Sequence, residues 1–444
     1  MARWRVIDAS RTDAAAQLRE LRRPLLLERL VLDDGPESRT VREIIADVRQ
    51  RGDQAVAEVT GRVDGAQVAP EAVRVPPGRI RQAWCDMEPD LRRAVEHAID
   101  SLTRFQRHIL PAPPAPLRER GRTLQMRAAP LSRVGICVPG AAAPLLSSVI
   151  HCAVPARVAG VPELAVIAPP RHRLPDGGFD VHPAILGVAG ALGIDEVYRM
   201  GGAQGVAALA LGTQRVRRVD KIVGPGGVYV QLAKRLLYGV VDIDMFAATT
   251  EVVIIADDSA RPDFLAADML AQAEHNPGCS ILLTDAPHLP DRLIAEIERL
   301  LAGLSTAPAA ARWLEEYGAI VVVRDLDQAA ALADEIAPEH LEIETRRPRE
   351  LADRIRNAGA IFLGHYSPES SGDYVAGPSH VLPTGGTARF WSGVSALSFL
   401  RYTSITEYDR DGLTGDADAI DRLARAEGLE AHARSATCRL EEAG

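Results

Sequence analysis

The chain has 444 residues, which is enough for two or three domains that each bury a hydrophobic core. Its 47% hydrophobic and 25% charged residues are typical of a soluble globular protein and argue against a disordered chain. The formal charge of -9 argues against a general binder of nucleic acid, because such a protein needs Lys and Arg concentrated on one face.

The sequence indicates neither export nor membrane insertion. The N-terminal stretch MARWRVIDASRTDAAAQ is positively charged but lacks an apolar core of signal-peptide length. No run of about 18 apolar residues occurs, which excludes an ordinary transmembrane helix. The five cysteines are scattered and form no Cys-x-x-Cys pair. We therefore expect a cytoplasmic protein with free thiols and with no membrane or nucleic-acid partner.

The first part of the chain is predicted to be helical. Within residues 38–60, apolar side chains recur at helical spacing: Val41, Ile44, Ile45, Val48, Val56 and Val59. A second helical pattern covers about 90–110. The prolines of LPAPPAPLRERG (110–121) then end it, because successive prolines cannot continue a helix.

From about residue 131 short apolar runs alternate with helical patterns, which predicts βαβ units and parallel sheets. A first set of predicted strands covers 134–138, 163–170, 196–200 and 221–226. A second set covers 251–257, 280–285, 319–325 and 360–364. The expected fold class is α/β, with two Rossmann-like parallel-sheet units and helical N- and C-terminal segments.

These patterns suggest a division into four parts. Residues 1–26 form an N-terminal helical segment, and residues 395–444 form a C-terminal helical segment. Residues 27–136 and 250–394 together form one Rossmann-like unit. Residues 137–249 form a second unit inserted into the first.

Polar residues gather where the helix predicted over 260–275 ends. Gln272 and His275 are three residues apart, so both side chains lie on one face of a helix and can converge on one point. A polar cap at a helix end is the commoner explanation of such a pair. Glu274, between them, can orient a neighbouring side chain.

Two further segments contain candidate acid-base residues. Glu339 and His340 are adjacent after a proline, and such a pair supplies two proton-transfer groups of different basicity. A capping carboxylate beside a half-buried histidine is the alternative. The segment 364–386 has no regular period, and long irregular segments in compact domains are often functional. Asp373 and His380 are its candidate ligands or acid-base groups, unless it is a mobile surface loop.

The glycine-rich stretches GGAQG (201–205) and GPGGVYV (224–230) lie at strand ends in the second unit. Backbone amides and helix N-termini at such turns can receive a phosphate. Neither stretch is a complete Gly-x-Gly-x-x-Gly fingerprint, so tight turns explain them nearly as well.

These segments, in this order, resemble the histidinol dehydrogenase family. The resemblance runs from VREIIADVRQRGD (41–53) to GLEAHA (428–433), and its specificity comes from LAQAEH, APEHLEI and SPESSGDYVAGPSHVLPT together. Members bind a catalytic zinc through Gln, His, Asp and His, and the matching positions here are Gln272, His275, Asp373 and His432. Zinc accepts such donors, although an amide oxygen is a weak ligand.

The resemblance also implies a reaction. Glu339 and His340 match the acid-base residues, His380 and Glu427 match substrate contacts, and Thr250 keeps a hydroxyl at a substrate-facing position. Family members oxidise an amino alcohol through an aldehyde to a carboxylate with two hydride transfers to NAD, in amino-acid biosynthesis. They are homodimers in which the C-terminal segment completes the neighbour's site.

The nucleotide side departs from the family pattern. Cys137 stands where the family has an aromatic residue, and Gly227 replaces an NAD-contacting asparagine. Phe246 adds bulk in the loop that leads to Thr250, and Gln204 is the residue that still matches the NAD surface. A zinc-dependent, NAD-linked dehydrogenase is the first hypothesis. A zinc enzyme of this fold that acts without NAD is the alternative, and a non-catalytic binding protein is the third.

Overall fold

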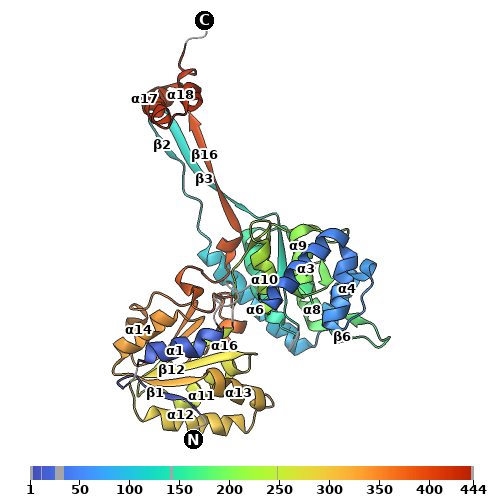
Figure 1. Cartoon of the computed structure of the whole chain (residues 1–444), viewed down its shortest axis with the longest axis vertical. Coiled ribbons are helices and arrows are strands. Elements are labelled where there is room, and N and C mark those ends of the chain that lie inside the picture. Colours follow the sequence, from blue (N-terminus) through green and yellow to red (C-terminus); the bar gives the residue numbers. More distant parts are fainter. Residues whose placement is uncertain (1–3, 12, 26–34, 141–143, 248, 442–444) are drawn as a thin grey trace.

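The computed structural model describes residues 4–11, 13–25, 35–140, 144–247 and 249–441. Figure 1 shows two α/β lobes and an arm that extends away from them. We call the lobes the six-stranded lobe and the five-stranded lobe after their sheets. The prediction of two α/β units with parallel sheets is confirmed. The expected limit between residues 26 and 27 lies outside the described residues.

The six-stranded lobe is built on a wholly parallel sheet of order β1-β13-β12-β11-β14-β15. Its strands are β1 (Val6–Asp8), β11 (Thr250–Ala256), β12 (Gly278–Thr284), β13 (Ala319–Val322), β14 (His340–Glu344) and β15 (Ala360–Leu363). One face packs on α11 (Pro262–Ala273), α12 (Leu289–Leu301) and α13 (Ala307–Tyr317). The other packs on α1 (Ala14–Arg22), α14 (Leu326–Ile336) and α15 (Pro348–Ala352).

Successive side chains of β11 point to opposite faces of the sheet, and both faces are covered by helices. Val252 and Ile254 enter one core, and Val253 and Ile255 enter the other. A strand buried on both faces therefore shows a continuous apolar run, which is why the sequence predicted it.

The five-stranded lobe has the parallel order β10-β9-β4-β5-β8. Its strands are β4 (Arg133–Cys137), β5 (Glu163–Ala168), β8 (Val197–Arg199), β9 (Lys221–Val223) and β10 (Asp242–Ile243). One core contains α5 (Pro77–Cys85), α6 (Pro89–Ile109), α7 (Leu146–Ala159) and α8 (Pro183–Ala191). The other contains α3 (Pro36–Arg51), α4 (Asp53–Asp64), α9 (Gly202–Leu211) and α10 (Val228–Leu237).

The helices of residues 36–109 are packed differently from our expectation. We grouped residues 27–136 with 250–394, but the apolar faces of α3 to α6 contact the five-stranded sheet and its helices. Helical spacing identifies an apolar face without saying which sheet covers it. The sequence pattern therefore predicted these helices but not their partner.

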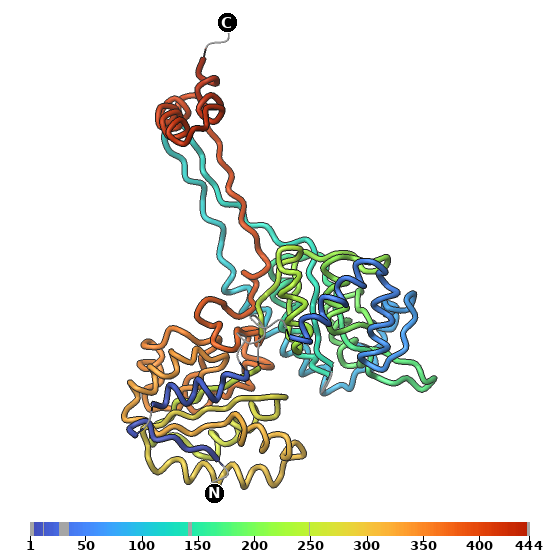
Figure 2. Tube along the Cα trace, in the orientation of Figure 1, coloured from blue at the N-terminus to red at the C-terminus, as the bar shows by residue number. Residues whose placement is uncertain are grey.

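The arm joins segments that are far apart in the sequence, as the trace in Figure 2 shows. Its ribbon consists of β2 (Leu117–Glu119), β3 (Arg122–Pro130) and β16 (Leu400–Tyr408), all antiparallel. At its tip lie α17 (Arg410–Ala426) and α18 (Glu430–Thr437). The two terminal segments contain helices, as expected, and each also contributes a strand that the sequence analysis did not predict: β1 and β16.

Short elements complete the fold. The hairpin β6 (His172–Arg173) and β7 (Phe179–Asp180) projects from the five-stranded lobe, and α16 (Glu369–Tyr374) lies within the segment that we expected to be irregular. The 3-10 turns are Arg23–Leu25, Pro70–Ala72, Thr387–Arg389 and Ala396–Phe399. Within the described residues, no helix has both the length and the apolar character needed to cross a membrane.

Candidate active site

The candidate site lies at the amino ends of the central strands of the six-stranded sheet. Thr250 is the first residue of β11, and His340 is the first residue of β14, which pairs with β11. Gln272 belongs to the last turn of α11, and the chain continues through Glu274 to His275. Parallel pairing thus brings residues almost 100 positions apart to one edge of the sheet.

A hydrogen-bonded chain fixes the buried side of the site. The Gln272 amide Nε2 donates to Thr250 Oγ1 at 2.8 Å, and this hydroxyl donates to Glu339 Oε2 at 2.6 Å. Glu339 Oε2 also accepts the backbone N–H of Glu251 at 3.0 Å. Because the amide nitrogen is engaged, the Gln272 Oε1 atom is left buried without a hydrogen-bond partner. The side chain therefore presents an oxygen atom whose lone pairs are free to bind a cation or accept a hydrogen bond.

His340 is surrounded by carboxyl groups. Its Nδ1 lies 3.8 Å from Glu339 Oε2 and 3.6 Å from Glu369 Oε2, and its Nε2 lies 3.9 Å from Asp373 Oδ1. Neither ring nitrogen makes a hydrogen bond. Burial lowers the pKa of His340 to about 4, with Asp373 acting in the opposite direction. The imidazole is therefore neutral at pH 7 and can accept a proton.

Both neighbouring glutamates have raised pKa values. Burial raises the pKa of Glu339 well above its usual value, although the Thr250 hydroxyl and the Glu251 amide oppose the shift. Burial together with nearby carboxylates does the same to the pKa of Glu369. Groups of this kind are stronger bases than exposed carboxylates. Glu369 was not predicted from the sequence, although it precedes Asp373 by one helical turn, a spacing that places both on one face.

Asp373 is the anionic centre of the site. Its Oδ1 lies 3.7 Å from His380 Nδ1. Burial tends to raise its pKa, but His380, His340 and His275 together outweigh burial, and the pKa is lowered. His275 keeps contact with solvent, yet the surrounding protein removes enough water to lower its pKa. One carboxylate thus interacts with three imidazoles.

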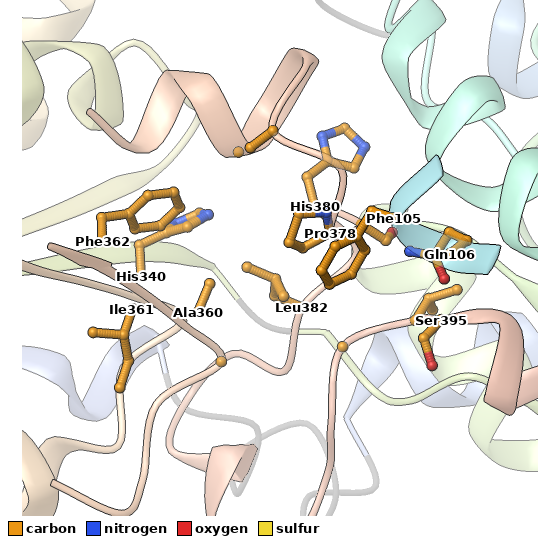
Figure 3. Close-up of a pocket in the computed structure, with 16 residues that line it drawn as sticks. Phe105, Gln106, His340, Ala360, Ile361, Phe362, Pro378, His380, Leu382 and Ser395 are labelled. Atoms are coloured by element: carbon orange, nitrogen blue, oxygen red, sulfur yellow. The ribbon is translucent and has the colours of Figure 1, made fainter. Parts of the chain in front are cut away.

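A cavity of about 330 Å³ opens beside these residues. Figure 3 shows His340 and Phe362 on one side of it and Phe105 and Gln106, from α6, on the other. It therefore lies between the two lobes. His380 reaches it from the loop after α16, and its Nε2 atom is buried without a partner. The cavity is large enough for a small-molecule ligand.

Three predicted residues lie away from this cluster. Glu427 and His432 are exposed near the tip of the arm, far from the cavity within one chain. Gln204 is buried in α9, where its Nε2 donates to Thr60 Oγ1 at 3.4 Å, so its side chain faces the interior of the five-stranded lobe. The other seven meet at one site: Thr250, Gln272, His275, Glu339, His340, Asp373 and His380.

The donors in this cluster suit a zinc ion. Gln272 supplies an amide oxygen without a hydrogen-bond partner, Asp373 a carboxylate and His275 an imidazole. His340 and His380 also have ring nitrogens without partners. A second acidic group lies further along β14, where Asp268, Glu342 and Glu344 approach one another within 4.8 Å. Burial raises the pKa of Asp268 to about 7 and that of Glu342 well above its usual value, and the negative charge of a neighbouring carboxylate acts in the same direction on each.

The glycine-rich turn after β9 is closely packed against β4. Gly224 has φ +107°, and a Cβ there would lie 2.3 Å from the carbonyl oxygen of Cys137, so this turn requires glycine. Its N–H donates to Asp244, which is paired with the buried Lys234. The Cys137 thiol is buried, which raises its pKa to about 12. Its side chain belongs to the apolar core of the five-stranded lobe.

The sequence and the fold were compared with known proteins. A profile described as histidinol dehydrogenase matches residues 28–440. The chain is 47% identical over 414 residues to a histidinol dehydrogenase of Moorella thermoacetica, covering 93% of this chain and 96% of that one. It is 46% identical over 401 residues to the Rhodopirellula baltica enzyme, covering 90% and 86%. The crystal structure of histidinol dehydrogenase from Elizabethkingia anophelis superposes with a TM-score of 0.89 at 30% identity and covers 99% of this chain and 98% of that one. The chain therefore belongs to the histidinol dehydrogenase family.

Proposed function

We propose that this chain is a zinc-dependent dehydrogenase that oxidises histidinol, or a closely related amino alcohol, to the carboxylate with NAD as the hydride acceptor. The observation that carries the proposal is the buried Glu339-His340 pair beside the unpartnered Gln272 Oε1 atom and the Asp373 carboxylate. The named relatives support the substrate, since two of them at 46–47% identity are histidinol dehydrogenases.

Zinc would be held by Gln272, His275 and Asp373, with His432 supplied by a second copy of the chain. The exposed position of His432 on the arm supports this arrangement, because within one chain it is far from the other three. Glu427 lies five residues before it and would contact the substrate in the same neighbouring site. The proposed functional unit is accordingly a homodimer. When bound, zinc would supply a positive charge that polarises the substrate oxygen.

His340 is suited to remove the hydroxyl proton in the first oxidation. Its ring is neutral at pH 7, and the carboxyl groups of Glu339, Glu369 and Asp373 lie close enough to stabilise the imidazolium that forms. His340 would take the hydroxyl proton of the alcohol, and NAD, when bound, would accept the hydride, which leaves the aldehyde. His380 lines the cavity beside this base and would orient the substrate together with Thr250, whose hydroxyl donates to Glu339.

Glu339 is suited to activate water in the second oxidation. Burial makes its carboxylate strongly basic, and Thr250 and the Glu251 amide fix its orientation. Glu339 would take a proton from the water that adds to the aldehyde, and the hydrate would supply a second hydride to another NAD. In balance, one alcohol, one water and two NAD+ would yield one carboxylate, two NADH and three protons.

A zinc enzyme without NAD is the second candidate, and three observations favour it. Gln204 faces the lobe interior, Cys137 is buried in the core, and Gly227 offers no side chain to the nucleotide. Calorimetric titration of the zinc-loaded protein with NAD, alone and with histidinol, separates the two. Binding supports the dehydrogenase, and its absence even at millimolar NAD supports non-redox chemistry.

Turnover is tested by the rise in absorbance at 340 nm with NAD and histidinol, together with quantification of histidine. The dehydrogenase predicts two NADH per histidine. The variants His340→Ala and Glu339→Gln should lose turnover while the purified protein keeps its zinc. Full activity in either variant would contradict the assigned roles, and a protein that purifies without metal would contradict the zinc site.

A further inference from the structure

A histidine outside the predicted site packs directly on one of its members. His151 lies in α7 of the five-stranded lobe and is fully buried. Its ring stacks on the ring of His380, with centroids 4.1 Å apart and planes inclined by 30°. The helix α7 is mostly apolar, and its buried Val, Ile, Cys and Ala side chains belong to the core of the lobe. A polar ring in such a helix needs a specific partner.

That partner is the backbone of the His380 loop. The N–H of His380 donates to His151 Nδ1 at 3.0 Å. Ser379 Oγ donates to the carbonyl oxygen of His151 at 3.0 Å, and the same hydroxyl accepts the N–H of Val381 at 3.2 Å. Two consecutive residues of the loop are thus bonded to one residue of α7.

These contacts define the state of His151. Since Nδ1 accepts a hydrogen bond, the proton of the neutral ring is on Nε2. Burial, reinforced by His380, lowers its pKa well below the usual value, so the ring stays neutral. A neutral ring stacked on His380 adds no charge repulsion to the site.

The geometry points to His151 as a positioning residue for His380. The stack and the hydrogen bond hold the His380 ring with Nδ1 towards Asp373, at 3.7 Å, and leave its buried Nε2 free for a ligand in the cavity. His151 itself does not line the cavity, so it acts through His380. It also connects the five-stranded lobe to the site. The inference rests on the proposed function for the identity of the substrate alone.

Two substitutions separate the two contacts of His151. His151→Phe keeps a ring for stacking but removes the acceptor, and His151→Asn keeps an acceptor near the position of Nδ1 but removes the ring. Loss of one such hydrogen bond predicts a KM for histidinol about threefold to tenfold higher in the Phe variant, with kcat changed less than about twofold. The Asn variant should recover part of the loss.

Two controls distinguish positioning from a general structural role. His182 also accepts a backbone N–H with its Nδ1, from Ala184 at 3.2 Å, at the start of α8 in the same lobe. His182→Phe should leave KM unchanged. In a His380→Ala background, His151→Phe should raise KM no further, because the residue that it positions is gone. A fall in melting temperature without a change in KM, or an equal further rise in that background, would overturn the inference.

A crystal structure provides a readout independent of turnover. In the Phe variant, the His380 ring should turn away from Asp373, whereas in the Asn variant it should stay in place. If the Phe variant does not fold, His151→Leu takes its place in the comparison. If the wild-type protein fails to oxidise histidinol, the proposed function is wrong, and the ring position still decides the role of His151. If the His380 ring keeps the same position in all variants, His151 does not position it and the inference is wrong.

Discussion

The hydroxyl of Thr250 joins two buried groups of the site, which makes Thr250→Val a sharp test. Valine keeps the shape of the side chain but removes the acceptor of the Gln272 amide and one donor to Glu339. A buried polar group left without a partner costs about 1–3 kcal/mol. Glu339 keeps the Glu251 amide as a second donor, so its loss is smaller. Together we expect the free energy of unfolding to fall by about 2–4 kcal/mol.

The same substitution should change the pH dependence of catalysis. The Thr250 hydrogen bond lowers the pKa of Glu339, against the raising effect of burial. Without it the pKa of Glu339 rises further, and in the proposed mechanism this carboxyl group must be deprotonated to activate water. The acid limb of the kcat/KM profile should therefore move to higher pH.

Urea denaturation and pH-rate profiles measure the two effects, with Thr250→Ser as the matched control because it keeps the hydroxyl. The serine variant should resemble wild type in the position of the acid limb. If the valine and serine variants unfold at the same urea concentration and share one acid limb, the Thr250 hydroxyl does not couple Gln272 to Glu339, and the reasoning fails.

Three further predictions concern the nucleotide turn and two ion pairs. A Cβ at Gly227 would meet no heavy atom within 4 Å, and φ there is -67°, so the Gly227→Asn variant should fold normally. We expect its KM for NAD to be about fivefold to tenfold lower, because the asparagine adds a hydrogen-bonding side chain. An unchanged KM would argue against nucleotide binding at this turn. Arg22 donates two hydrogen bonds to Glu251 in a buried ion pair, at 3.0 and 2.6 Å. Arg22→Met should lower the free energy of unfolding, measured in urea, by about 3–5 kcal/mol, whereas Arg19→Ala, in an exposed ion pair, should lower it by less than about 1 kcal/mol. Equal losses in the two variants would contradict the role of burial. Burial tends to raise the pKa of Glu196, but hydrogen bonds lower it to about 2, so its stabilisation is complete above pH 4.5 and is lost as the pH falls towards 2. The stability difference between wild type and Glu196→Gln should therefore narrow between pH 4.5 and pH 3, and a constant difference would refute the assignment. The partners in these hydrogen bonds are Arg133, Tyr198 and Arg217.

The sequence predicted the sheets well because their central strands are buried on both faces. β11 and β12 show continuous apolar runs for this reason. β16 is exposed on both faces, so it has no apolar alternation and was taken for part of a helical tail. Its pairing with β3, more than 270 residues earlier, depends on a contact that no local pattern records.

The site was predictable to the extent that its residues lie in recognisable segments. Glu339, His340, Asp373 and His380 were identified from such segments, and the structure brings them together. His151 could not be identified in the same way, because a lone histidine in an apolar helix gives no sign of the loop that packs on it. The direction of the Gln204 side chain likewise depends on Thr60, in a distant helix.

The position of the site at the amino ends of the strands has an electrostatic consequence. The helices α11 and α14 run back along the sheet and end beside the site, just before His275 and Glu339. The carboxyl end of a helix carries about half a negative charge, so this edge attracts cations such as a metal ion or the ammonium group of an amino alcohol. In the five-stranded lobe, by contrast, α9 and α10 begin at the glycine-rich turns after β8 and β9, and helix N-termini attract phosphates. Ala247 lies three residues before Thr250, and its N–H donates to Gln231 of α10 at 2.9 Å. This hydrogen bond connects the helix that begins at the second glycine-rich turn to the chain just before the edge of the six-stranded sheet. The backbone dipoles of the two lobes therefore favour opposite charges, which agrees with the proposed binding of an amino alcohol at one lobe and of a nucleotide at the other.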